Sequence, residues 1–181
     1  MEFFIVFEGE IKQEPTLKLI NAILAAINEG IYEKINIFFS SLGGSIYEGF
    51  IIANVIQNSK IPIAMHAVNH IDSIANVVFL AAKERTAESH AKFFLHGASV
   101  NLASADEGTL LEHLSSVRTH NSRIAYFISE NSTIPLQKVQ DLMRKRTTLS
   151  AQQALKEGIV SQIAHKEMNS TDPRNEIVYV T

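Results

Sequence analysis

The sequence contains no cysteine among its 181 residues, so disulfide bonds and thiolate metal sites are excluded. It has no uninterrupted apolar run of membrane-spanning length, and its first ten residues, MEFFIVFEGE, lack the basic flank of a signal peptide. Charge of neither sign dominates, since 16 basic and 19 acidic residues leave a net charge of −3, and RKR at 144–146 is the densest basic cluster. We therefore expect a soluble, cytoplasmic protein that acts without membrane, nucleic acid, metal or cofactor.

Strand and helix patterns alternate along the chain, of which 46% is apolar, enough for a domain with a substantial core. Runs rich in aromatic and β-branched residues indicate buried strands, and apolar residues three or four positions apart indicate amphipathic helices. This alternation is typical of an α/β domain with parallel strand pairing. The expected strands are 3–9, 34–40, 61–68, 91–97 and 159–165, and the expected helices are 15–29, 46–55, 73–83, 104–130, 135–142 and 150–158.

No internal repeat, low-complexity stretch or linker interrupts residues 1–165, so we expect one domain over this range. Within it, residues 104–130 predict one long helix with a single apolar stripe. Residues 166–181 begin with the polar stretch KEMNSTDPRNE and are expected to form a loose C-terminal tail.

Residues with useful chemistry follow the ends of three predicted strands, where α/β folds place their sites. Gly43 and Gly44 can present bare N–H groups to a ligand, although paired glycines more often make only a tight turn. Ser73 begins a helix, where serine is usually an N-cap, and the N–H of Ile74 points the same way as its hydroxyl. His96 ends an aromatic strand, where histidine is more often a packed residue than a base. Together they supply the nucleophile, base and N–H donors that acyl transfer requires.

Four segments resemble the Clp protease proteolytic subunit family. SLGG (41–44) resembles its Ser-Pro-Gly-Gly turn, and NHIDSIA (69–75) followed by an apolar helix resembles the segment that carries its nucleophile. FLHG (94–97) is similar to its Met-Ile-His-Gln-Pro segment, and LSAQQALKEGIVSQI (149–163) to its Leu-Ser-Ala segment. The resemblance covers roughly residues 3–165 and implies a serine endopeptidase.

In that resemblance, Ser73 attacks the peptide carbonyl and His96 takes its proton. The turn at Gly43 and Gly44 forms the oxyanion hole, in which the N–H groups of Gly44 and Ile74 hold the developing negative charge.

The resemblance also implies a fold and an assembly. We expect an α/β, ClpP/crotonase-like fold of repeated β-β-α units in a spiral, with the helix at 104–130 projecting as a handle. The substrate would be a peptide or unfolded protein, and the chain would self-assemble into a ring-type homo-oligomer. The family's N-terminal segment lines an axial pore and engages an unfoldase ATPase. Because this chain begins at its first predicted strand, we expect no such ATPase partner.

The third member of the family's catalytic triad departs from the pattern. Its aspartate comes four residues before the serine of Leu-Ser-Ala, and counting back from Ser150 gives Arg146, which would repel an imidazolium. His70 and Asp72 replace small or neutral residues beside the nucleophile, so they are candidate auxiliary residues. A dyad of Ser73 and His96 remains able to act, because loss of the third member lowers catalysis without abolishing it.

Two other functions stay open. The chain could be a catalytically weak or inactive homologue that serves as an oligomeric scaffold or regulatory subunit, which Arg146 favours. It could also be an acyl-CoA hydratase or isomerase of the wider crotonase group, although the acid and base in those enzymes are commonly carboxylates.

Overall fold

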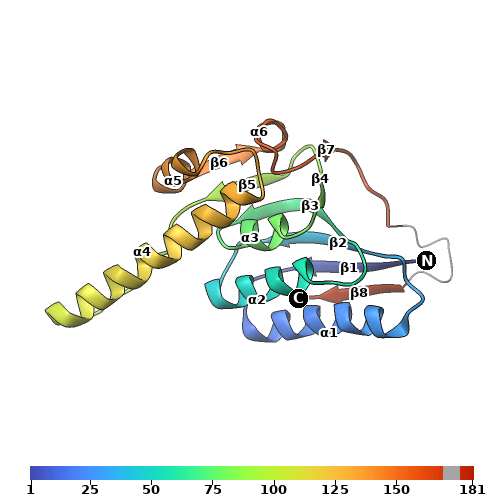
Figure 1. The fold of residues 1–181 in the computed structure, drawn as a ribbon, viewed down its shortest axis with the longest axis horizontal. Helices are drawn as coiled ribbons and strands as arrows, with labels where there is room; N and C mark the ends of the chain where they lie inside the picture. The colour runs from blue at the N-terminus through green and yellow to red at the C-terminus, as the bar shows by residue number, and fades with distance from the viewer. Residues whose placement is uncertain (169–175) are drawn as a thin grey trace.

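The computed structural model describes residues 1–168 and 176–181, in which eight strands form one sheet (Figure 1). The order along the sheet is β6-β5-β3-β2-β1-β8, while β4 pairs with β3 and β7. Every pairing is parallel except that of β5 with β6. The strands are β1 (Glu2–Glu8), β2 (Lys34–Ser41), β3 (Ile63–Asp72), β4 (Glu84–Ala87), β5 (Lys92–Leu95), β6 (Thr147–Ser150), β7 (Gln162–Ile163) and β8 (Glu176–Val180).

Six helices connect these strands in the described residues, and one of them stands apart. The N-terminal half of α4 projects away from the sheet, and its leucines at 110, 111 and 114 are exposed (Figure 1). The expected α/β fold with a projecting long helix is confirmed. No helix in the described ranges is long and apolar enough to cross a membrane. The helices are α1 (Gln13–Glu29), α2 (Ile46–Gln57), α3 (Ala75–Leu80), α4 (Glu107–Glu130), α5 (Leu136–Arg144) and α6 (Ala151–Lys156).

The core lies between the sheet and the helices that follow its strands. Alternate residues of a strand share a face, so one side of β1 and β2 contributes a continuous set of large apolar side chains. The short helix α3 is buried along its whole length, which places it inside the domain directly behind the end of β3. The buried residues of β1 and β2 on this side are Phe3, Ile5, Phe7, Ile35, Ile37 and Phe39.

Strand β3 continues to Asp72, four residues beyond the predicted end at 68. Its first half pairs with β4, whereas its last three residues, His70 to Asp72, pair with β5. Asn69, His70 and Asp72 were expected to follow the strand, but they belong to it. Polar side chains are tolerated at these positions because one face of this segment is partly open to solvent. The helix that follows is correspondingly shorter than predicted, from Ala75 to Leu80.

The C-terminal region differs from the expected polar tail at 166–181. Residues 169–175 of that range lie outside the described structure, but Glu176–Val180 form β8 and pair in parallel with β1. The sequence EIVYV explains this, because β-branched and aromatic residues favour a strand that borders an apolar one.

Candidate active site

Ser73 occupies a strained turn between β3 and α3. Its φ is +57°, a left-handed conformation that costs a residue with a side chain about 1–2 kcal/mol. Its N–H donates to the carbonyl oxygen of Phe94 at 2.9 Å, which ties the turn to β5. A strained strand-to-helix turn is a known way of exposing a nucleophilic hydroxyl, and the Ser73 side chain lies in a cavity of about 630 Å³.

Asn76 holds this turn in place, a role that the sequence reasoning missed. Its side chain is 1% exposed, and Nδ2 lies 2.9, 3.1 and 3.0 Å from the carbonyl oxygens of Ile71, Ser73 and Phe94. Because all three neighbours are acceptors, they fix the orientation of the amide. Asn76 therefore links the end of β3, the Ser73 turn and the end of β5. An asparagine in the apolar run ANVVFL was the available signal.

The glycine turn after β2 packs directly against Ser73. Gly43 has a φ of +94°, and a Cβ on it would lie 2.7 Å from Ser73 Cβ. Gly44 has a φ of +146°, and a Cβ there would overlap the carbonyl oxygen of Ile11. Both positions therefore require glycine.

The N–H groups around this turn differ in availability. The N–H of Gly43 donates to Ser41 Oγ at 3.1 Å, so this group is already used within the turn. The N–H groups of Gly44 and Ile74 have no hydrogen-bond acceptor among the described residues. Of the three expected oxyanion-hole residues, Gly44 and Ile74 retain a free donor, while Gly43 shapes the turn.

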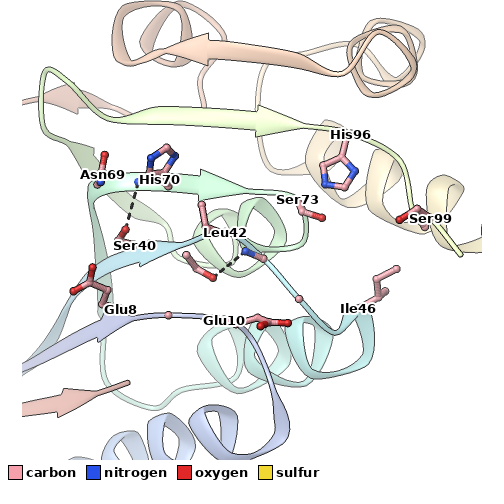
Figure 2. Close-up of a pocket in the computed structure, with 15 residues that line it drawn as sticks. Glu8, Glu10, Ser40, Leu42, Ile46, Asn69, His70, Ser73, His96 and Ser99 are labelled. Carbon is pink, nitrogen blue, oxygen red and sulfur yellow. Dashed lines mark hydrogen bonds between the residues drawn. The ribbon is translucent and has the colours of Figure 1, made fainter. Parts of the chain in front are cut away.

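His96 follows the last residue of β5 and lines the same cavity as Ser73 and Gly44 (Figure 2). Its Nδ1 lies 2.7 Å from the carbonyl oxygen of Gly97, so Nδ1 carries the proton and Nε2 is the basic nitrogen. The imidazole also packs on Phe94, with ring centroids 5.0 Å apart. No hydrogen bond joins Ser73 to His96 in the described structure, but the turn and the strand end bring both into one hollow.

Arg146 stands where the family resemblance requires an aspartate. The antiparallel pairing of β5 with β6 ends at Leu95 and Thr147, so His96 and Arg146 are the residues that flank this last pair on the two strands. Its guanidinium lies over the ring of Phe94, 5.9 Å from the centroid. The position of the triad acid therefore carries a positive charge. The carbonyl oxygen of Gly97, instead of a carboxylate, accepts the hydrogen bond from the His96 imidazole.

His70 and Asp72 lie on β3 before the turn. Their side chains approach at 3.5 Å between Nδ1 and Oδ2, and Asp72 Oδ1 is buried without a hydrogen-bond partner among the described residues. Burial raises the pKa of the Asp72 carboxyl, and the charges of His70 and His96 act against that rise. Figure 2 shows His70 on β3 near Asn69 and Ser40. Asp72 is close enough to His96 for their charges to interact.

The cavity contains groups suited to polar peptide chemistry but no metal centre. Within the described ranges, no three His, Asp or Glu side chains are arranged to hold a metal ion. The rim carries Glu8 and Glu10 on one side and the apolar side chains of Leu42 and Ile46 on another (Figure 2).

Comparison with known proteins covers nearly the whole chain. The family model described as Clp protease matches residues 1–167. The ATP-dependent Clp protease proteolytic subunit 2 of Treponema pallidum (strain Nichols) is 23% identical over 165 residues, which cover 90% of this chain and 82% of the relative. The protein of the same name from Treponema denticola is 24% identical over 163 residues, 88% of this chain and 80% of the relative.

A solved structure shows the same fold. The structure of a ClpP1 mutant from Listeria monocytogenes aligns with a TM-score of 0.80 and 21% identity, covering 91% of this chain and 92% of that one. The expected ClpP/crotonase-like fold is confirmed. Since the matching family model covers residues 1–167, which include the strand-end residues and the long helix, this chain belongs to the Clp protease family.

Proposed function

We propose that this chain is a serine endopeptidase with a Ser73–His96 dyad. The observation that carries the proposal is the convergence of Ser73, His96 and the Gly44 turn in one cavity, with Ser73 held at a φ of +57°. Ser73 Oγ attacks a peptide carbonyl while His96 Nε2 accepts the hydroxyl proton. The N–H groups of Gly44 and Ile74 hold the oxyanion, and each such donor contributes about 3 kcal/mol.

The second half of the reaction uses the same groups. The protonated His96 donates its proton to the leaving amine as the carbon–nitrogen bond breaks, which leaves an acyl group on Ser73. A water then attacks this ester, gives its proton to His96, and the acid product leaves as Ser73 recovers its proton.

We expect the peptidase to be weak, because Arg146 occupies the position of the third triad member. The Gly97 carbonyl orients the imidazole as an aspartate would, but it supplies a dipole instead of a full negative charge. Arg146 brings a positive charge to this position, whereas the half-buried Asp72 is close enough for its charge to act on His96. Because replacing the acid in a triad lowers kcat about 10⁴-fold, we expect turnover well below that of a peptidase with a complete triad.

A fluorophosphonate probe tests the proposal directly. The folded protein is expected to gain one phosphonyl group on Ser73, identified by peptide mass spectrometry, because the probe needs an activated serine and an oxyanion hole. Ser73→Ala should prevent labelling, and His96→Gln should slow it at least about 100-fold, the usual contribution of a general base. A folded protein that never labels would favour the second candidate function.

That second candidate is an inactive scaffold, favoured by Arg146 at the position where the family resemblance requires an aspartate. Either function is compatible with a homo-oligomer, since the exposed leucines of the projecting α4 offer an apolar surface to a second copy. We propose that the chain self-assembles through this helix, and light scattering at micromolar concentration would show a monomer if it does not.

Asp72→Asn is expected to stabilise the fold while weakening the reaction. Burial raises the pKa of Asp72, so its ionised form lowers stability above that pKa, and asparagine should raise the free energy of unfolding at pH 8 by less than about 1 kcal/mol after allowance for solvent screening. The gain should vanish as the pH falls and Asp72 becomes protonated. The labelling rate should fall a few-fold, which corresponds to about 1 kcal/mol of lost attraction to the imidazolium.

Urea unfolding at pH 8 and pH 4.5, together with probe kinetics, measures both effects. Asp141→Asn is the matched control, because Asp141 is more exposed and pairs with Arg144 at 2.6 Å. It should not stabilise the protein and should leave labelling unchanged. Faster labelling of Asp72→Asn would show that Asp72 does not assist His96.

A further inference from the structure

A second hollow of about 630 Å³ adjoins the active-site cavity and has the opposite electrostatic character. The two hollows share Ala98 and Ser99 in their walls, so the segment that follows His96 borders both. The active-site cavity is lined by Glu8 and by Glu10, which pairs with Lys12 at 2.7 Å, whereas the second hollow is lined by Arg118, Arg144 and Arg146.

The arginines of the second hollow are not neutralised by the described residues that line it. No carboxylate is among those lining residues. Arg144 pairs with Asp141 outside the hollow at 2.6 Å, but Arg118 and Arg146 form no ion pair within the described ranges. The chain as a whole has a net charge of −3, so this local excess of positive charge opposes the average. A site of this kind attracts an anion.

The neutral polar groups of the second hollow also favour a ligand that accepts hydrogen bonds. Asn121 uses its Oδ1 to accept the N–H of Ala98 at 2.6 Å, which leaves its amide N–H groups as further donors. Arg146 is held by its backbone at a φ of +53°, an unusual conformation for a residue with a side chain. Guanidinium groups bind carboxylates through paired, charge-assisted hydrogen bonds.

We propose that Arg118 and Arg146 bind a carboxylate of the peptide substrate, an inference that rests on the proposed peptidase function. The carboxylate comes from the C-terminus of a short peptide or from an aspartate or glutamate side chain. A peptide at Ser73 can reach the second hollow past Ala98 and Ser99, which line both.

Binding of this carboxylate would also assist the reaction. Arg146 and His96 both flank the Leu95–Thr147 pair, so an anion bound to Arg146 would offset a positive charge near the proposed base. The substrate then brings the negative charge that the protein lacks at this position. Peptides with a suitably placed carboxylate should bind more tightly and react faster than neutral ones.

Binding is tested on Ser73→Ala, so hydrolysis does not enter the measurement. The probes are acetyl-Ala-Ala-Ala-Ala with a free carboxylate, its C-terminal amide, and acetyl-Ala-Ala-Glu-Ala amide, titrated by saturation-transfer NMR. One or both carboxylate peptides are expected to bind about fivefold more tightly than the neutral amide, and which one does so identifies the source of the carboxylate. The preference should shrink with added salt.

Arginine variants locate the site. Arg118→Gln and Arg146→Gln, each in the Ser73→Ala background, should remove the preference for the carboxylate peptides. Arg123→Gln should keep it, because Arg123 lies on the same helix but stacks on Phe50, 4.3 Å from the ring centroid. Equal binding of the three peptides, absent binding of both carboxylate peptides at millimolar concentration, or a preference that survives both substitutions would overturn the proposal.

This outcome is separable from that of the peptidase proposal. A protein whose Ser73 labels with the fluorophosphonate, but which binds the three peptides equally, is a peptidase without the carboxylate site. A protein that prefers the carboxylate peptides but never labels has the binding site without the proposed chemistry.

Discussion

Gly43→Ala is expected to prevent labelling of Ser73 and to lower the free energy of unfolding by about 2–4 kcal/mol. The substitution imposes two costs. Gly43 has a φ of +94°, which a side chain disfavours, and the new Cβ would lie 2.7 Å from Ser73 Cβ and 2.8 Å from the Asp72 carbonyl oxygen. Neither contact is with a flexible side-chain end, so the glycine turn and the Ser73 turn must move apart.

That movement should matter more for the reaction than for the fold. In the proposed reaction, the free N–H of Gly44 would reach the oxyanion only while the glycine turn stays against Ser73, and losing one such donor costs about 10²–10³ in rate. Urea unfolding measures the stability change, and the fluorophosphonate measures reactivity in variants that remain folded.

Gly30→Ala is the matched control for this experiment. Gly30 also has a positive φ, +68°, at the end of α1, but a Cβ there meets nothing within 4 Å. It should cost only about 1 kcal/mol and leave labelling intact. If Gly43→Ala is as mild as this control, the close packing of the glycine turn on Ser73 is not important.

Asn76→Asp is expected to lower the free energy of unfolding at pH 8 by about 3–5 kcal/mol, the range for an uncompensated buried charge. Asn76 Nδ2 faces three carbonyl oxygens at 2.9 to 3.1 Å, and a carboxylate there would turn each attraction into repulsion. Protonation relieves part of this repulsion, so the pKa of the new carboxyl should rise in the folded state. The loss should therefore grow as the pH increases through that pKa.

The matched control is Asn58→Asp at the exposed end of α2. The Nδ2 of Asn58 also donates to a carbonyl oxygen, that of Asn54 at 2.8 Å, but in contact with solvent. This change should cost less than about 1 kcal/mol, the scale of a surface charge near a helix C-terminus. Similar losses for the two variants, measured by urea unfolding at pH 5 and pH 8, would mean that the Asn76 amide does not hold the turn.

The sequence predicted those parts of the fold whose signals are local. Strands β1 and β2 are long apolar runs, and the helix between them, α1, has a clear apolar stripe. The four-residue strands β4 and β6, with the sequences ERTA and TTLS, are too short and too polar to give such a signal. The antiparallel pairing of β5 with β6 was likewise not anticipated.

The candidate site also has parts that the sequence could indicate and parts that depend on the folded structure. Ser73 and His96 could be proposed from the sequence because a nucleophile and a base require particular side chains, and both residues follow predicted strands. The roles of Asn76 and the Gly97 carbonyl depend on which atoms the fold brings within hydrogen-bond distance, and the sequence does not state these distances. Arg146 was identified by counting from Ser150, but its place beside a cluster of arginines required the packing of α4 and α5.

The pairing of β1 with β8 has a consequence for biosynthesis. Strand β1 is made among the first residues of the chain, yet its outer neighbour is not available until residues 176–180 have been added. At translation rates of roughly 5–20 residues per second, that edge waits on the order of ten seconds or more without its partner. During this interval β1 can pair with β2 on one side, but its other edge stays open, and an unpaired strand edge is a template for association with other chains.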